Sequence, residues 1–303
     1  MKLAKSFSVF IAMLWVAAFS LCACSASGGE QTFEPTIPDE NGGEANSSSG
    51  TSTSSSSGSA DKKLDSLFTW VKVPASVITR GTAKYGISAF EVASTEVTRK
   101  AYKLVMGELP QQGNEGDSLP VENINWFQAA LFCNAYSKLL GADTAYVYTS
   151  VGSDYYLDSL FIDYSAADAI RMLTENEWEV AARAGTTTTY YWSTDEAKKY
   201  AYYAQTKGPV AVASFISNDY GLYDMAGNVA EWVNDWYGTY ENKSVDNPTG
   251  AASGSSRVIR GGGWSSVAKD IAPTARDKKE PLYKHHTLGF RVGRGALLWP
   301  ENL

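Results

Sequence analysis

Hydrophobic and polar positions divide the chain into three parts with different patterns. An apolar run extends from Phe7 to Phe19, interrupted only by Ser8, whereas residues 43–59 are almost entirely Gly, Ser, Thr, Asn and Ala. From about residue 67 to residue 294, short alternating or apolar stretches are separated by turn-forming residues, and few segments have helical spacing. The pattern predicts a leader, a linker and one folded domain.

Three segments of the third part carry helix start and stop signals, and they predict helices over residues 99–106, 126–140 and 175–184. Each follows a residue whose side-chain oxygen can cap a helix N-terminus: Thr98, Asn125 and Thr174. Each is followed by a glycine, the usual residue beyond a helix C-terminus: Gly107, Gly141 and Gly185. The apolar residues of the second helix recur at helical spacing and are expected to face the core.

Strand-like segments surround these helices: residues 68–73, 89–92, 146–148, 158–163, 210–215, 229–233, 257–260 and 289–292. Few helices combined with many short strands and long loops are typical of the α+β class. We predict a single domain over residues 66–294, followed by a short tail over residues 295–303.

The N-terminal apolar run has the features of a secretory signal, since Lys2 and Lys5 flank its start and the run itself carries no charge. Residues 21–24 (LCAC) resemble the bacterial lipobox, in which an aliphatic residue and small residues precede a cysteine that is diacylated and becomes the mature N-terminus. We therefore predict a lipoprotein signal peptide over residues 1–23 and lipidation of Cys24. The alternative is an ordinary signal peptide cleaved nearby, with Cys24 incidental.

Residues 24–65 lack the apolar side chains that would offset the entropy of ordering them, so they predict a disordered tether. Ser25 follows the lipidated cysteine. By resemblance to the sorting rule of enterobacteria, a residue other than Asp at this place indicates the outer membrane. The sequence therefore predicts a domain held in the bacterial cell envelope, with the lipid anchor as its contact with the membrane.

Composition narrows the chemistry further. The chain has 303 residues, with 26 Lys and Arg against 33 Asp and Glu, for a formal charge of −7. This acidic balance argues against a nucleic-acid partner, which requires basic patches to neutralise phosphates. Two His and three Cys exclude most His-rich or Cys-rich metal sites. If Cys22 leaves with the leader and Cys24 is lipidated, Cys133 is the one thiol left, and no intramolecular disulfide can form.

An ordered series of motifs runs through the domain: residues 119–126 (LPVENINW), 171–179 (RMLTENEWE), 221–232 (GLYDMAGNVAEW), 257–264 (RVIRGGGW) and 289–292 (GFRV). Their sequence and order resemble the formylglycine-generating enzyme family, also called sulfatase-modifying factors. The resemblance covers essentially the whole domain. It implies the family fold, an unusual variant of the C-type lectin fold with little regular secondary structure.

The resemblance also implies where the family's chemistry would lie. Authentic members oxidise a sulfatase cysteine to formylglycine with dioxygen, using copper(I) held by two cysteine thiolates, which are the soft ligands that this metal selects. Carried onto this chain, those cysteines fall on Ser266 and Ile271. A serine hydroxyl is a poor copper(I) ligand and an isoleucine is none, so no catalytic residue is assigned and copper is not expected.

Other sources of chemistry are weak in this sequence. Cys133 lies within a helix on an apolar face, which indicates a buried structural cysteine. His285 and His286 are adjacent, and neighbouring side chains of a strand point to opposite faces, so they would chelate a metal poorly. A triad of Ser265 or Ser266 with a histidine and an aspartate lacks a nucleophile elbow. The run Gly261–Gly263 is better explained by close backbone approach or positive φ.

The resemblance implies a structural calcium ion held by oxygens of Gly227, Asn228, Val229 and Glu231, and a hard cation suits such ligands. The alternative is that Glu231 accepts backbone N–H groups or pairs with an arginine. The remaining charged residues of the motifs are interpreted as structural ion pairs: Glu96, Glu177, Glu179 and Asp235, with Arg171, Arg183, Arg276 and Arg291.

Three hypotheses for function follow. The first is a surface lipoprotein whose domain binds a protein, peptide or glycan without redox chemistry. The second is an oxidoreductase of the family that acts on a peptide or a small thiol through a non-standard site, and the third is a component of envelope assembly. Whether the chain is an enzyme is left open at this point. A polar pocket beside Ser266 is the structural feature that bears most on the choice.

Overall fold

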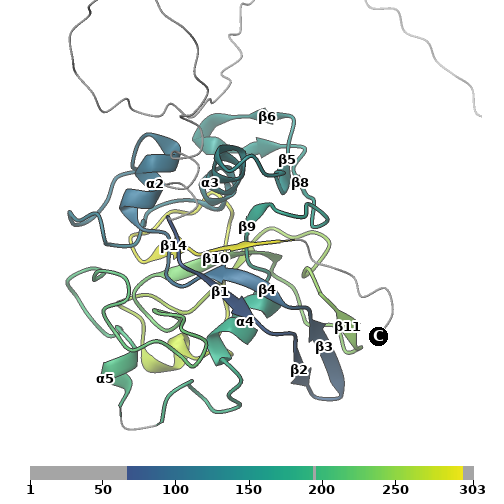
Figure 1. Cartoon of the computed structure of the whole chain (residues 1–303), viewed down its shortest axis with the longest axis vertical. Coiled ribbons are helices and arrows are strands. Elements are labelled where there is room, and N and C mark those ends of the chain that lie inside the picture. Colours follow the sequence, from purple (N-terminus) through teal and green to yellow (C-terminus); the bar gives the residue numbers. More distant parts are fainter. Residues whose placement is uncertain (1–66, 194–195, 296–303) are drawn as a thin grey trace, which may run out of the picture. The chain divides into compact units, whose positions relative to one another are not determined.

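The computed structural model describes residues 67–193 and 196–295, and their backbone combines short strands with few helices (Figure 1). The helices are α2 (Arg99–Met106), α3 (Trp126–Leu139), α4 (Glu175–Arg183) and α5 (Ala197–Tyr200), with the 3-10 turns η1 (Ser153–Tyr155) and η2 (Ala268–Ile271). None of the helices in this part of the chain is long and apolar enough to cross a membrane. The α+β prediction is confirmed. The predicted signal peptide, Cys24, the tether and residues 296–303 lie outside the described residues.

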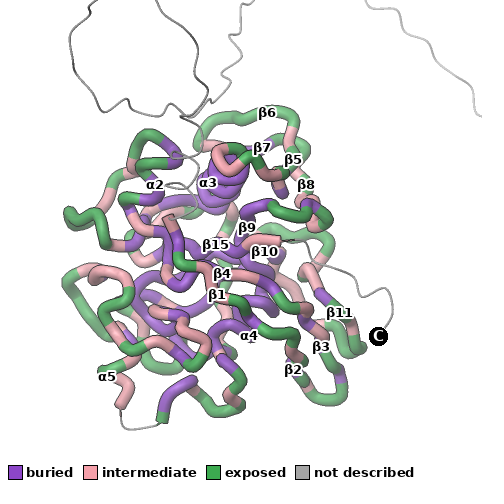
Figure 2. The backbone as a smooth tube through the Cα atoms, in the orientation of Figure 1, coloured by how far each residue is buried: buried purple, intermediate pink, exposed green. Residues whose placement is uncertain are grey.

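Helix capping follows the sequence signals closely. Thr98 accepts a hydrogen bond from the Ala101 N–H at the start of α2, and Gly107 ends that helix with a left-handed backbone. The N-caps of α3 and α4, Asn125 and Thr174, each form a complete capping box with the residue three positions on. One expectation was too narrow, because α3 is buried on all sides from residue 126 to residue 137 rather than on one face (Figure 2).

Within the described residues, the strands form two four-stranded sheets and three smaller ones. One large sheet has the order β1 (Trp70–Val73), β4 (Phe90–Ala93), β15 (Val292–Arg294), β9 (Ile170–Met172). The other has the order β13 (Asp277–Lys279), β12 (Arg257–Arg260), β10 (Ala230–Trp236), β14 (Leu288–Phe290), with only β10 and β14 parallel. The smaller sheets are β11 (Val245–Asp246) with β3 (Ala83–Ile87) and β2 (Ser76–Arg80), β5 (Tyr146–Val147) with β8 (Phe161–Ile162), and β6 (Ser150–Val151) with β7 (Leu157–Asp158).

The structure corrects three strand predictions. Residues 210–215 form a loop, because the N–H groups of Val210 and Ala213 donate to the side chains of Asn228 and Asp224 instead of joining a ladder. The hairpin of β2 and β3 was not predicted from sequence. The predicted strands at residues 158–163 and 289–292 are each divided between different sheets, the first between β7 and β8 and the second between β14 and β15.

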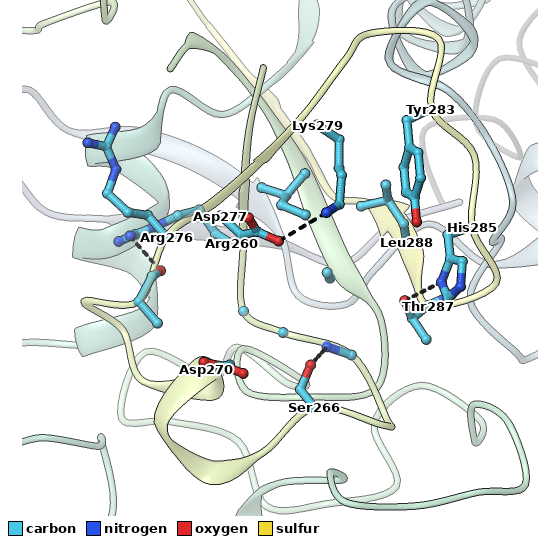
Figure 3. A pocket seen from close by; sticks show the side chains of 16 residues that line it. Arg260, Ser266, Asp270, Arg276, Asp277, Lys279, Tyr283, His285, Thr287 and Leu288 are labelled. Atoms are coloured by element: carbon cyan, nitrogen blue, oxygen red, sulfur yellow. Dashed lines mark hydrogen bonds and ion pairs between the residues drawn. The ribbon is translucent and has the colours of Figure 1, made fainter. Parts of the chain in front are cut away.

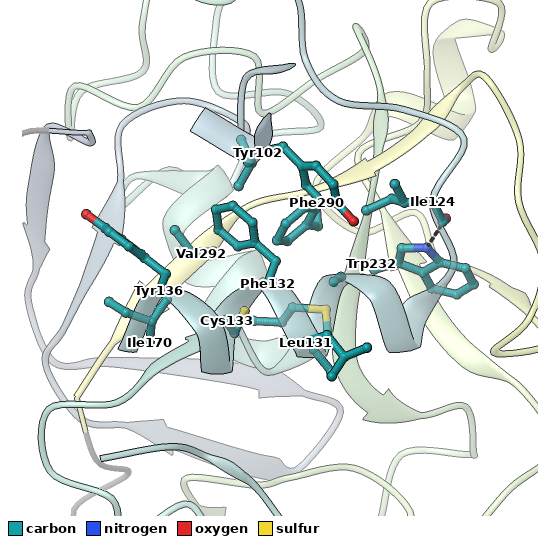
Figure 4. Close-up of a cluster of buried hydrophobic side chains, with 14 of the residues drawn as sticks. Tyr102, Ile124, Leu131, Phe132, Cys133, Tyr136, Ile170, Trp232, Phe290 and Val292 are labelled. Carbon is teal, nitrogen blue, oxygen red and sulfur yellow. Dashed lines mark hydrogen bonds between the residues drawn. The ribbon is translucent and has the colours of Figure 1, made fainter. Parts of the chain in front are cut away.

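Two hydrophobic clusters lie on opposite faces of the central strands. Trp232 of β10 belongs to the cluster that surrounds α3, whereas the next residue, Val233, belongs to the cluster that includes Trp178 of α4. Because successive residues of a strand point to opposite faces, β10 is buried on both sides and has no solvent-exposed face, although it carries the buried polar residues Glu231, Asn234 and Asp235. Figure 4 shows the first cluster, in which Phe132 and Phe290 meet edge to face with ring centroids 5.2 Å apart.

Arg291 lies between β14 and β15, at the point where the chain passes from one large sheet to the other. Its side chain is buried and forms an ion pair with Glu231 of β10, with Nη2 2.9 Å from Oε1. The same guanidinium donates to the carbonyl oxygens of Ala93 and Tyr223. The Arg291–Glu231 pair therefore links both sheets and the loop before β10.

Replacing Arg291 by methionine is expected to lower the free energy of unfolding by about 3–5 kcal/mol, because the Glu231 carboxylate would stay buried without its partner. The double variant R291M/E231Q should recover part of this loss, since no unpaired charge is left. Urea unfolding followed by tryptophan fluorescence measures both. An R291M variant within about 1 kcal/mol of wild type would contradict the role given to this pair.

Candidate functional site

A polar pocket lies where β12 ends and the following glycines begin. It has a volume of about 440 Å³ and is lined on one side by the charged residues Arg260, Asp270, Arg276, Asp277 and Lys279. In Figure 3, Ser266 lies beside Asp270 at the bottom of the view, and Tyr283 and His285 lie at the right, across from Arg260 and Arg276. We call it the Ser266 pocket. Sequence reasoning named Ser266, His285 and, only as an ion-pair residue, Arg276, but not Arg260 or Lys279.

Glycines shape the floor of the Ser266 pocket. Gly262 has φ of +63°, and a Cβ there would come within 2.9 Å of the Asp270 carbonyl oxygen and of Ile271 Cγ2. A Cβ on Gly263 would come within 2.8 Å of the Thr287 backbone oxygen. Both reasons proposed from the sequence for this glycine run, close approach and positive φ, are therefore confirmed.

The two positions where the resemblance places copper-binding cysteines differ in their surroundings. Ser266 is half-buried on the wall of the pocket, and its hydroxyl accepts a hydrogen bond from the Gly263 N–H at 3.0 Å. Ile271 is fully buried in the apolar cluster that contains Trp178. One position is thus a turn-forming hydroxyl and the other a core side chain.

The environment of Cys133 is apolar, unlike that of the Ser266 pocket. Cys133 is fully buried in α3 within the hydrophobic cluster of Figure 4. Burial raises the pKa of its thiol far above the ordinary value, so the reactive thiolate is disfavoured. The interpretation of Cys133 as a structural cysteine agrees with this environment.

The histidines do not point to opposite faces as expected. Their segment is a turn rather than a strand, and the rings of His285 and His286 stack with centroids 4.1 Å apart. His285 Nδ1 lies 2.7 Å from Thr287 Oγ1, and burial together with His286 and Lys279 lowers the pKa of His285. Stacked rings hold their nitrogen lone pairs side by side, so these do not converge on one metal ion.

The described residues contain no hydrogen bond between Ser265 or Ser266 and a histidine, so the sequence-level serine triad is not assembled here. Nor do these residues include a group of three or more His, Cys, Asp or Glu side chains arranged to hold a metal ion. What the Ser266 pocket does offer is hydrogen-bonding and charged groups of both signs around an open volume.

Comparison with known proteins places this domain in a family. The family model described as "Sulfatase-modifying factor enzyme 1-like domain" matches residues 48–296, which is most of the chain. The chain belongs to the sulfatase-modifying factor family. The fold predicted from the motif series, the family's variant of the C-type lectin fold, is confirmed.

Individual relatives cover the chain to different extents. The structure of Treponema denticola variable protein 1 is 32% identical, with a TM-score of 0.68, and the match covers 75% of this chain and 95% of that protein. The formylglycine-generating enzyme of Mus musculus is 33% identical over 147 residues, 42% of this chain and 40% of the enzyme. The serine/threonine-protein kinase pkn1 of Chlamydia caviae is 40% identical over 130 residues, 42% of this chain. The chain spans only about a fifth of that kinase (21%).

Residues 227–231, for which the family resemblance implies a calcium site, are hydrogen-bonded to other protein groups. Glu231 accepts hydrogen bonds from Arg291 and, through Oε2, from Trp178 Nε1 at 2.7 Å. Asn228 donates its side-chain amide to Glu96 at 2.7 Å, and Val229 N–H also donates to Glu96. A cation would therefore have to displace Arg291 from Glu231, and the residues as placed do not fit a calcium ion. Pairing of Glu231 with an arginine is the alternative that this geometry matches.

The prediction of structural ion pairs holds for Glu177, Glu179 and the arginines of the set. Arg171 binds Glu177 through two hydrogen bonds of 2.7 Å, and Arg183 Nε lies 2.9 Å from Glu179. Arg276 binds Glu175 instead of one of the acids singled out from sequence. Lone sequence positions do not reveal such partners, because they depend on which strands are brought together.

Asp235, like Glu96, forms no ion pair among the described residues, and its contacts are unusual. It lies on β10 at the wall of a second cavity of about 360 Å³, with Oδ2 accepting the Glu175 N–H at 2.7 Å. Oδ1 is buried without a hydrogen-bond partner among the described residues. Burial, reinforced by Glu175 and Glu177, raises the pKa of Asp235 to about 8. The neutral acid is thus the favoured form in the folded protein.

A carboxyl group with a raised folded-state pKa contributes stability below its unfolded pKa, near 4, and loses it as the pH rises to the folded value. We expect the stability advantage of Asp235→Asn over wild type to grow by up to about 1.4 kcal/mol per pH unit between pH 4 and pH 8 and then to stay constant. Urea unfolding at pH 5, 6.5, 8 and 9 measures this difference. The exposed Asp143→Asn is the control for charge loss, and an advantage independent of pH would disprove the assignment.

Proposed function

We propose that this protein is a lipoprotein of the bacterial envelope whose sulfatase-modifying-factor domain binds a ligand in the Ser266 pocket and does not oxidise cysteine with copper. The observation that carries the proposal is the pocket itself. It is open and polar at the place where the family resemblance puts copper chemistry, while the two positions in question are a serine and a buried isoleucine. Binding by this site needs no metal.

The surroundings of the pocket favour a peptide or protein ligand. Charged side chains of both signs line its inside, with Lys279 Nζ 3.6 Å from Asp277. Large apolar side chains are exposed on the loops beside it: Val267 (53%), Leu282 (45%) and Tyr283 (37%). Apolar contacts combined with a small number of placed polar groups are typical of protein recognition sites.

Oxidation chemistry at this site lacks the groups that it needs. Among the described residues, Cys133 is the free cysteine, and it is buried in the core. The second hypothesis, an oxidoreductase of the same family, would thus have to act without a thiolate in the pocket. Its support is the similarity to formylglycine-generating enzymes, which is a similarity of sequence and fold.

The mass of a substrate peptide distinguishes the two hypotheses. A Cys-x-Pro-x-Arg peptide incubated anaerobically with the domain and copper(I), then exposed to oxygen, is expected to keep its mass, because no pair of thiolates holds the metal. The Mus musculus enzyme run in parallel controls for the assay. Conversion of the peptide cysteine to formylglycine by this chain would refute the binding proposal.

Binding is measured on the same domain with an array of peptides from bacterial envelope proteins and an array of glycans. Ser266→Trp fills the pocket and should weaken binding at least tenfold, whereas the exposed Ser253→Trp should not. Peptide signals that depend on Ser266 support the proposal as stated, and glycan signals with this dependence would change the ligand class. Binding that survives S266W would place the ligand elsewhere.

The membrane anchor is proposed from residues 21–24 and needs a separate test. In cells supplied with labelled fatty acid, the wild-type chain is expected to carry label and to fractionate with outer membranes. Cys24→Ala should abolish both, because the thiol that accepts the lipid is lost, while C22A should leave both unchanged. Label on C24A would show that another residue carries the lipid.

A further inference from the structure

Four arginines and two glutamates form one connected ion network that joins β2, α4, β12 and the segment before β13. Glu179 binds Arg80 and Arg260 through Oε2, at 2.5 Å and 3.1 Å, and Arg183 through Oε1 at 2.9 Å. Glu175 binds Arg276 through both oxygens, at 2.8 Å and 2.6 Å.

Arg260 joins the two halves of the network. It lies within 3.6 Å of Glu175 as well as contacting Glu179. The ring of Tyr240 contacts two guanidinium groups of the network. Its centroid lies 3.9 Å from Arg80 Cζ and 4.2 Å from Arg276 Cζ.

The network carries more positive than negative charge, with four guanidinium groups against two carboxylates. Backbone carbonyl oxygens accept some of the donors of Arg260 and Arg276, but Arg260 Nε is buried without a hydrogen-bond partner among the described residues. Unbalanced charge is costly in a protein interior, so the surplus must be met by solvent or by an anion at the exposed ends of the network. Two of these ends are the side chains of Arg80 (18% exposed) and Arg183 (20% exposed).

Both of these ends line a cavity of about 530 Å³ between β2 and the loop after α4, which we call the Arg183 groove. Glu179 is the one acidic residue along it, and Arg80 and Glu179 are bound to each other. Arg183 uses only Nε in contacts with the described residues, so its Nη1 and Nη2 groups are available to a ligand.

Hydroxyl groups complete the lining of the groove: Ser76, Thr79, Thr186, Thr187 and Thr274. Among these, the side chain of Thr186 is occupied, donating to the Arg183 carbonyl oxygen. Hydroxyls that can donate, placed beside a partly free guanidinium, are the groups that bind tetrahedral oxyanions.

We propose that the Arg183 groove binds a sulfate or phosphate group, either as the free ion or as an ester. The guanidinium of Arg183 and the hydroxyls of Thr274 and of the other groove residues hold the oxygens of the anion. The surplus positive charge of the network attracts the anion. The volume leaves room for a group attached to the oxyanion. This site is separate from the Ser266 pocket, because neither Arg183 nor Thr274 lines that pocket, although Arg260 and Arg276 of the same network do.

Calorimetric titration of the domain with sodium sulfate and sodium phosphate, at ionic strength held constant with sodium chloride, tests the site. Saturable binding is expected for wild type, about tenfold weaker binding for Arg183→Gln, and a smaller loss for Thr274→Val, which keeps the shape of the side chain. Lys72→Gln removes one exposed positive charge outside the groove and should bind like wild type. Thermal unfolding confirms that each variant is folded.

The source of the anion is distinguished by a second arm, with glucose 6-sulfate and glucose 6-phosphate in place of the free ions. Tighter binding of an ester assigns the groove to an esterified ligand, and equal binding assigns it to the free ion. The proposal is overturned if no saturable binding occurs, or if R183Q binds as tightly as wild type. Sulfate and phosphate also stabilise proteins by exclusion from their surface, and that effect would be the same in R183Q.

Discussion

The buried pair of Arg291 and Glu231 is the contact on which the arrangement of this domain depends. Arg291 separates β14 from β15, so one residue stands at the junction of both large sheets, and its guanidinium binds β10 and the carbonyl of Ala93 at the end of β4. Two further carboxyl groups lie nearby. Burial raises the pKa of Glu96 well above its usual value, which favours its neutral form, and it raises the pKa of Asp224 to about 6. With Glu96 neutral, a single guanidinium need not balance three full negative charges.

The need to satisfy buried polar groups also explains why protein side chains occupy Glu231, in the segment where the family resemblance implies calcium. The fold has little regular structure, so many N–H groups of its loops must be satisfied by side chains rather than by ladders. Glu96 accepts the Val229 N–H, Asn228 accepts the Val210 N–H, and Asn218 accepts those of Tyr220 and Leu222. Buried polar side chains thus replace secondary structure, and in this chain the Glu231 carboxylate is bound by Arg291 and Trp178.

The family's chemistry and its scaffold are separable in this chain. The glycines at residues 261–263 still allow the chain after β12 to approach η2 closely, and an open pocket remains beside it. The residues that would hold copper are a hydroxyl on the wall and an aliphatic side chain in the core. An open polar pocket, at which the positions that the family resemblance assigns to copper are a serine and an isoleucine, is suited to binding, which is the basis of the function proposed here.

The sequence by itself determined the family, the fold class, the three main helices with their caps, and the absence of a thiol pair near residue 266, because these depend on local residue patterns. It did not reveal the loop at residues 210–215, the stacking of His285 on His286, or the partners of Asp235 and Arg276. These were decided by contacts between residues distant in sequence, such as Glu175 with Arg276. The Ser266 pocket and the Arg183 groove belong to this second class, since each is built from loops that only the folded chain brings together.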